Sequence, residues 1–238
     1  MLPLMLTLGL AAAADAPIST DRPGNANAAT VVPEARFQVE TSANVAISDG
    51  REAVTFPTLF RFGLFGFSEL RLGSSVVGID GSGAEPTDTL VGAKFQISKS
   101  AAFVPDLSLM ADVFLPSGNV PFTNDVVVPE LRAAAAWGLP AGFGLLLNLG
   151  LDLPEVAGDR FSRIIWVANL GYSIPIVQQL SVFVEGFGQI STDDRVPTNT
   201  QFDAGVAFLL TDDVQLDSFI QVGDQTDFQV AAGVSFRL

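Results

Sequence analysis

After the first 33 residues, apolar and polar side chains alternate with a period of two along almost the whole chain. In the segment 37–47, Phe37 and Val39 fall on one face, and Gln38 and Glu40 fall on the other. This period indicates β-strands, because successive side chains of a strand point to opposite faces. The alternation predicts twelve strands, at 37–47, 53–63, 67–74, 88–98, 106–115, 128–138, 143–152, 162–174, 179–190, 200–210, 213–222 and 227–238.

The composition is apolar, with 48% hydrophobic and 16% charged residues. No stretch beyond residue 14 approaches the roughly 18 apolar residues of a membrane-spanning helix. A membrane barrel fits these facts, because one face of each strand meets lipid and the other meets the lumen. We therefore expect an all-β fold, an antiparallel transmembrane up-and-down β-barrel of about 12 strands over residues 34–238. Ten or fourteen strands, if boundaries such as 64–67 are drawn differently, and a secreted soluble β-sandwich are the alternatives.

The connections between the predicted strands alternate between short and long. The short ones are 139–142, 174–179 and 211–213. The long ones, rich in Gly, Pro, Asp, Asn and Thr, are 75–87, 116–127, 153–161 and 191–199. Outer-membrane barrels have short periplasmic turns and longer outer loops, so this order predicts a bacterial outer-membrane location. The segments 48–52 and 223–226 are the exceptions, as short outer loops.

The N-terminus resembles an export signal. The segment Met1–Leu10 is almost wholly apolar, and Ala11–Ala14 offers small residues for cleavage. We expect a signal peptide at 1–14 with the cut after Ala14, although the usual basic segment is missing. A buried N-terminal strand or helix is the alternative.

Residues 15–33, called the leader below, precede the first predicted strand and therefore lie on the periplasmic side. Pro23 and Gly24 end any strand there. The leader could fold into the barrel mouth as a plug, with Asp21 and Arg22 pairing to charges in the lumen. A disordered leader is the equal alternative.

Charge and residue types exclude several functions. The formal net charge of −14 opposes binding to nucleic acid, whose phosphates need Lys and Arg. The chain has no Cys and no His, which removes disulfides, thiolate and Ser–His chemistry, and ordinary zinc or haem ligation. We expect no enzyme, no cofactor and no metal, and we interpret the acidic pairs 193–194 and 212–213 as solvated turns.

Charged residues on the polar faces of the strands are the candidate site, because a charge facing lipid at mid-membrane costs several kcal/mol. The alternation places these side chains in the lumen: Arg61, Glu69, Arg71, Lys94, Asp112, Glu130, Arg132, Asp152, Arg163, Glu185, Asp203, Asp217 and Arg237. Arg61 and Glu69 flank the turn near Phe65 symmetrically and could pair across the hairpin. Two interpretations stay open, a salt-bridged ladder that fills the barrel and a charged constriction that selects solutes.

Two motifs resemble the opening of a bacterial family. They are Ile18-Ser-Thr-Asp-Arg-Pro-Gly24 and Val31-Val-Pro-Glu-Ala-Arg-Phe-Gln-Val-Glu40, where Ala35 stands in place of the family's usual Gly. Glu69-Leu-Arg-Leu-Gly73 is similar to the family's third strand. The family is described as "putative MetA-pathway of phenol degradation", a group of transporter-like outer-membrane proteins. The resemblance covers residues 18–238 and implies uptake of aromatic or other small solutes.

The sequence thus leaves two functions open. One is a passive channel or transporter for small solutes, which requires an open or gateable lumen. The other is a structural or interaction barrel that has a filled lumen and acts through its outer loops. We expect outer-membrane lipid, lipopolysaccharide and the barrel assembly machinery as partners, since the chain ends in the alternating run Val234-Ser-Phe-Arg-Leu238.

Overall fold

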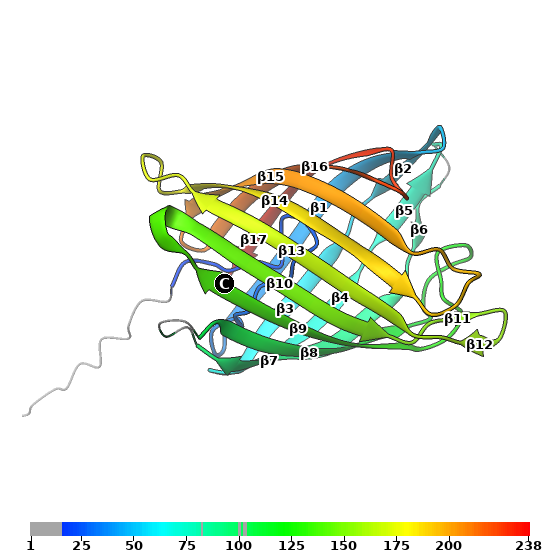
Figure 1. Ribbon diagram of the computed structural model, residues 1–238, viewed down its shortest axis with the longest axis horizontal. Coiled ribbons are helices and arrows are strands. Elements are labelled where there is room, and N and C mark those ends of the chain that lie inside the picture. The colour runs from blue at the N-terminus through cyan, green and yellow to red at the C-terminus, as the bar shows by residue number, and fades with distance from the viewer. Residues whose placement is uncertain (1–15, 82, 100, 102–103) are drawn as a thin grey trace, which may run out of the picture.

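The computed structural model describes residues 16–81, 83–99, 101 and 104–238, so the predicted signal peptide at 1–14 lies outside the described residues. Twelve antiparallel strands close into a barrel (Figure 1), because each pairs with its neighbour in sequence and the last pairs with the first. The strands are β1 (Phe37–Ser48), β2 (Arg51–Thr55) with β3 (Thr58–Phe65), β4 (Ser68–Ser74), β7 (Thr89–Ser98), β8 (Asp106–Leu115), β9 (Val128–Gly138), β10 (Phe143–Asp152), β13 (Arg163–Ser173), β14 (Leu180–Ser191), β15 (Asn199–Thr211), β16 (Val214–Gly223) and β17 (Phe228–Arg237). The predicted number of strands is confirmed.

The predicted strand 53–63 is interrupted. β3 pairs with the first half of β1, and β2 pairs with its second half. The break lies at Phe56 and Pro57, where proline has no N–H to donate to a ladder. The barrel therefore keeps twelve positions, although one of them holds two strands.

Two predicted loops contain short strands. The connection 75–87 includes β5 (Val76–Ile79) and β6 (Glu85–Pro86), and β5 pairs with β2 in the same register in which β4 pairs with β3. The connection 153–161 includes the small hairpin β11 (Glu155–Val156) and β12 (Asp159–Arg160). Period-two alternation did not reveal them, because pieces of two to four residues are too short for a periodic signal.

The connections sort by length between the two ends of the barrel, as predicted, and the short outer connections at 49–50 and 224–227 are the expected exceptions (Figure 1). One end holds the turns 66–67, 139–142, 174–179 and 212–213, the connection between β7 and β8, and both ends of the barrel chain. The 3-10 helix η1 (Pro140–Gly142) lies in one of these turns. We call this the inner end, facing the periplasm, and the end with the long connections the outer end.

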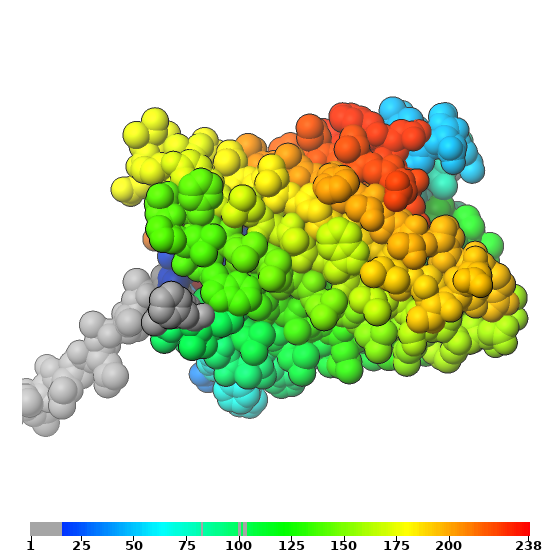
Figure 2. Space-filling view, in the orientation of Figure 1, coloured from blue at the N-terminus to red at the C-terminus, as the bar shows by residue number. Residues whose placement is uncertain are grey.

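The barrel is apolar outside and polar inside. Arg61 is fully buried, although its neighbours Phe60 and Phe62 are 38% and 40% exposed. Asn148 and Asp152 of β10 are buried in the same way, while Leu149 is 63% exposed. Figure 2 shows the exterior from one side as a continuous surface. Among the described residues, no helix is long and apolar enough to cross a membrane. The apolar exterior is the surface that lipid covers.

A charge placed on this exterior should destabilise the barrel. We expect Val184→Arg, at a residue of β14 that is 56% exposed, to lower the free energy of unfolding by about 2–4 kcal/mol, because the guanidinium would face hydrocarbon. Urea unfolding in lipid vesicles measures the change. The control is Ile176→Arg, at a residue 92% exposed in the turn 174–179, where we expect almost no cost. Equal costs at the two positions would contradict a lipid-facing β14.

Candidate functional site

The described part of the leader lies inside the barrel, as the blue segment of Figure 1 shows. The chain leaves the lumen and joins the wall just before β1, where Ala35 N donates to Gly63 O (2.9 Å) and Gly63 N donates to Arg36 O (3.0 Å). Ala35 has a φ of 59°, in the left-handed region that glycine adopts at least cost. This conformation explains why glycine suits the position. Within the leader, Ile18, Ala26 and Val32 are buried.

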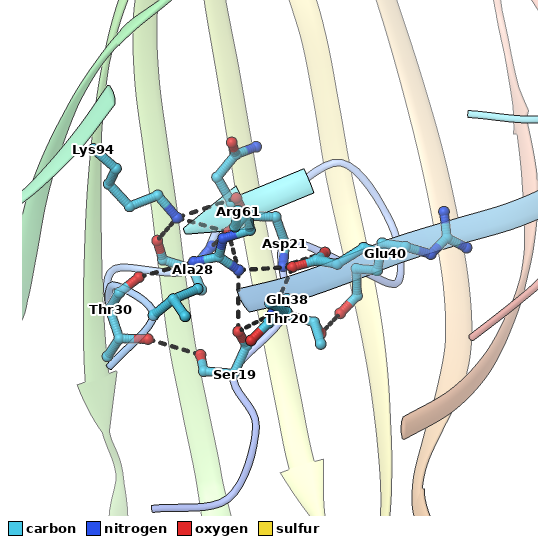
Figure 3. A network of polar contacts seen from close by, with 12 residues as sticks. Ser19, Thr20, Asp21, Ala28, Thr30, Gln38, Glu40, Arg61 and Lys94 are labelled. Atoms are coloured by element: carbon cyan, nitrogen blue, oxygen red, sulfur yellow. Dashed lines mark hydrogen bonds and ion pairs between the residues drawn. The ribbon is translucent and has the colours of Figure 1, made fainter. Parts of the chain in front are cut away.

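Asp21 is at the centre of a buried group of charges, which we call the central network (Figure 3). Its carboxylate accepts from Lys94 Nζ at 2.7 and 3.1 Å, from Arg71 Nη1 at 2.5 Å and from Ala28 N at 2.8 Å, and it lies 3.7 Å from Arg61 Nη1. The other members are two wall carboxylates, Glu40 and Glu69. All six side chains are at least nine-tenths buried, so the network has little contact with water.

The expected pair of Arg61 and Glu69 exists and is bidentate, with two N–H···O contacts of 2.8 Å. The two residues do not lie directly opposite each other. Arg61 is opposite Arg71 and Glu69 is opposite Gly63, because the hairpin turns at residues 66–67 and not around Phe65. The pair is therefore diagonal, and it leaves Arg61 Nη1 free to reach Glu40 Oε1 at 2.7 Å.

A second contact region lies across the lumen, on three strands that carry Glu185, Asp203 and Asp217, which we call the acidic wall. Asn25 N and Ala26 N of the leader donate to Glu185 at 2.6 and 3.1 Å. Asn25 Nδ2 donates to Asp203 at 3.2 Å, and Arg22 Nη2 donates to Asp217 at 2.8 Å. The leader therefore carries an anion toward the central network and donors toward the acidic wall.

Polar contacts hold most of the leader, and apolar packing adds little. Asn27 and Asn148 exchange two hydrogen bonds, of 2.7 and 3.0 Å, and Val32 N donates to Glu69 at 2.7 Å. The cluster of buried apolar residues is small, with Ala29 of the leader against Met110 and Ala134 of the wall. The lumen therefore holds the leader by hydrogen bonds and ion pairs, which water can replace.

The leader separates two cavities in the lumen. The outer vestibule, about 480 Å³, is lined by Asp21, Asn25 and Asn27 of the leader and by Arg71 and Arg132 of the wall, among others. The inner vestibule, about 420 Å³, is lined by Ala16, Pro17, Ser19 and residues 30–33 of the leader and by polar wall residues such as Gln38. In this conformation the central network and the leader lie between them.

The remaining predicted lumen charges pair with other residues of the barrel. Two of them also reach the leader or the central network. Glu130 lies 2.9 Å from Arg132, and Asp152 lies 2.5 Å from Arg163. Asp112 lies 3.5 Å from Arg71 Nε and so joins the edge of the central network. Arg237 pairs with Asp213 at 2.6 Å and donates to Ala16 O of the leader at 2.9 Å, at the inner end.

The outer connections and adjoining strand ends carry an acidic rim. Among the described residues there, twelve side chains are acidic and Arg51, Arg160 and Arg195 are basic, which gives a net formal charge of −9. The acidic ones are Asp49, Glu52, Asp80, Glu85, Asp88, Asp125, Glu155, Asp159, Asp193, Asp194, Asp224 and Asp227. Among the described residues, no group of three or more acidic side chains is arranged to hold a metal ion.

Asp88 orders the loop above the outer vestibule. Its carboxylate accepts from Gly118 N at 3.1 Å and from Asn124 N and Nδ2 at 2.8 and 2.9 Å. Burial alone would raise the pKa of this carboxyl, but the donated hydrogen bonds outweigh it and hold the pKa below the ordinary value. Asp88 therefore stays ionised and keeps residues 118–124 at the mouth of the cavity.

Sequence reasoning missed several residues that contact the leader: Gln38, Glu40, Ser42, Gly63 and Asn148. The signal for the polar ones was present, since they lie on the same inward faces as the predicted charges. Gly63 carried no such signal. Its importance comes from the close passage of Val32 and Pro33, which only the folded chain reveals.

A closed antiparallel barrel with an apolar exterior and a polar, charged lumen defines an outer-membrane β-barrel. The chain belongs to the family described as "Putative MetA-pathway of phenol degradation", whose model matches residues 20–238. No curated protein sequence matches the chain.

Solved structures of channels and porins share the fold. The COG4313 outer membrane channel from Pseudomonas putida F1 superposes with a TM-score of 0.66 at 13% identity, covering 91% of this chain and 99% of that one. The NanC porin gives 0.63 at 12% identity, covering 85% and 100%. The KdgM porin in complex with disordered oligogalacturonate gives 0.59 at 9% identity, covering 84% and 98%. At these identities the likeness concerns the fold.

Proposed function

We propose that the protein is a passive outer-membrane channel for small solutes, aromatic ones included, and that the leader closes its lumen. The observation that carries the proposal is the pair of polar cavities on the two sides of the leader. If the leader moves aside, the cavities join into one path through the barrel. The family and the shared fold with channels and porins support this assignment.

The polar contacts that hold the leader suit a segment that moves. A hydrogen bond inside a protein contributes only about 0.5–1.5 kcal/mol net, or about 1.5–3 kcal/mol where one partner is charged, because water offers the same partners when it breaks. A large apolar core would have no such substitute, and the leader adds only Ala29 to the buried apolar cluster, besides single buried residues such as Ile18 and Val32. The leader can therefore exchange its partners for water without unfolding the barrel.

Planar-bilayer recording of the full chain tests the proposal. We expect discrete openings, and we expect Arg132→Gln to change their conductance, because Arg132 lines the outer vestibule and pairs with Glu130 and not with the leader. Absence of ion current and of solute flux into vesicles would contradict the channel.

A filled structural barrel is the second candidate, and the buried central network favours it, because its charges have little contact with water. It predicts an ion-tight barrel whose outer loops carry the function. Under either proposal the chain has no catalytic role, its apolar belt contacts lipid and lipopolysaccharide, and β17 is the strand that the assembly machinery recognises.

A further inference from the structure

The acidic wall depends on the leader for most of its hydrogen-bond donors. Glu185 and Asp203 lie opposite each other on β14 and β15. Asp217 lies on the next strand, β16, where it is opposite Ala207 of β15. All three are buried, at 3%, 5% and 6% exposure. The leader supplies two backbone N–H groups, one amide and the Arg22 guanidinium, while Asn169 of the wall supplies one further amide, to Glu185.

Two oxygens of this wall, Asp203 Oδ1 and Asp217 Oδ2, lack a hydrogen-bond partner among the described residues even with the leader in place. Asp217 Oδ2 is buried and has no hydrogen-bond partner among the described residues, although Asp217 Oδ1 accepts from Arg22. A buried carboxylate oxygen without a donor is costly, so this position favours any further cation or N–H group. Displacement of the leader would add to that demand.

The wall residues of the central network still have partners of opposite charge when the leader leaves. Arg61 stays paired with Glu40 and Glu69 at 2.7 and 2.8 Å. Arg71 keeps Asp112 at 3.5 Å and Glu69 at 3.4 Å, and Lys94 lies 3.8 Å from Glu69. The charges left without partners in an open lumen are therefore the carboxylates of the acidic wall.

The outer end of the lumen is negatively charged, like the acidic wall. The acidic rim has a net formal charge of −9, whereas the inner end carries four acidic and three basic side chains among the described residues, Glu34, Asp106, Asp212 and Asp213 against Arg36, Lys99 and Arg237. A charged mouth of this kind raises the local concentration of counter-ions. Cations are therefore concentrated where a solute enters.

We propose that the open path selects cations, and that its solutes are neutral molecules and small organic cations bearing ammonium groups rather than carboxylates of the same size. A solute with N–H donors or a positive charge can replace the leader's contacts on the acidic wall. A carboxylate meets repulsion first at the rim and then at Glu185, Asp203 and Asp217. This inference rests on the proposed channel and specifies its solute class.

The reversal potential of the full chain under a potassium chloride gradient tests the inference. It reports open channels only, so it does not depend on how often the leader moves. We expect K⁺ to permeate several times better than Cl⁻ at about 0.1 M, and less so at about 1 M, because the Debye length falls from about 10 Å to 3 Å. Currents with equal or greater Cl⁻ permeability would overturn the selectivity and leave the channel standing, whereas no current would overturn both.

A variant with reversed charges at the acidic rim tests whether the rim contributes to the ion selectivity. Glu52, Asp125 and Asp194 are exposed, and no hydrogen bond or ion pair of their carboxylates is recorded in the described part of the chain. The triple variant E52K/D125K/D194K should lower the K⁺/Cl⁻ permeability ratio by about threefold or more. Asp212→Lys is the control, because it makes the same change at one exposed residue of the inner end and should move the ratio little. An unchanged ratio in the triple variant would contradict the rim's role.

Organic ions test the solute class itself. Benzylammonium and benzoate are probes of nearly equal size and opposite charge. We expect benzylammonium to permeate several times better in the wild type, and Asp217→Asn to narrow the difference, because that variant removes one charge from the acidic wall. Better permeation of benzoate would overturn the proposed class, even if inorganic cations were preferred.

Discussion

Asp21→Asn is expected to raise the open probability of the channel by tenfold or more. The asparagine keeps the size of the side chain but removes the anion that meets Lys94 and Arg71 at 2.7 and 2.5 Å. Removing one partner of a buried ion pair costs about 3–5 kcal/mol, and each 1.4 kcal/mol is a factor of ten in an equilibrium constant. The cost acts on the closed state, since Asp21 leaves these partners when the leader moves. Single-channel recording in planar bilayers measures the change.

Asp212→Asn is the matched control for Asp21→Asn. It neutralises an exposed carboxylate at the inner end that has no recorded ion pair in the described part of the chain. We expect its open probability to equal that of the wild type. If Asp21→Asn also left the open probability unchanged while the barrel stayed folded, Asp21 would not hold the leader closed.

Gly63→Ala is expected to displace the leader without any change of charge. A Cβ at this position of β3 would lie 1.9 Å from Pro33 O and 2.6 Å from Val32 O. These are backbone atoms, so the strain cannot be relieved by rotating a side chain. Overpacking of this kind costs about 1–3 kcal/mol, which predicts an open probability about tenfold higher. The ion selectivity should stay that of the wild type.

Gly73→Ala is the control, because Gly73 is an inward-facing glycine of the neighbouring strand β4 and lines the outer vestibule. Its Cβ would meet Leu59 Cδ1 at 3.4 Å and Leu90 Cβ at 3.5 Å, which are ordinary contacts. We expect normal gating from this variant. Equal open probabilities for the two alanine variants would contradict a leader held against Gly63.

Much of the barrel follows from local rules. Alternation predicted the number of strands, because a strand between lipid and lumen must change polarity at every residue. It also predicted which charges face inward, from Arg61 on β3 to Arg237 on β17. Loop lengths predicted which end faces the periplasm. Each of these properties depends on neighbouring residues of one strand or one turn.

The contacts of the leader could not be predicted in the same way. Asp21 meets Lys94, 73 residues away, and Arg22 meets Asp217, 195 residues away. Such partners depend on the path of an irregular segment through the lumen, and no periodic pattern encodes that path. The position of the hairpin turn at residues 66–67 likewise decided which residue lies opposite Arg61. The sequence therefore supplied the charges of the site but not their pairing.

The central claim is that the leader closes the lumen and leaves it during opening. The chain has no cysteine, so Ala26→Cys places one thiol in the leader, where the residue is 5% exposed. The decisive measurement is its rate of reaction with a membrane-impermeant thiol reagent, recorded together with the current in Ala26→Cys alone and with Asp21→Asn or Gly63→Ala added. We predict a rate that rises in proportion to the open probability, and a current that stays high once the leader is modified. A channel that conducts while this cysteine stays unreactive would contradict the claim, because ions would then be passing a leader that has not moved.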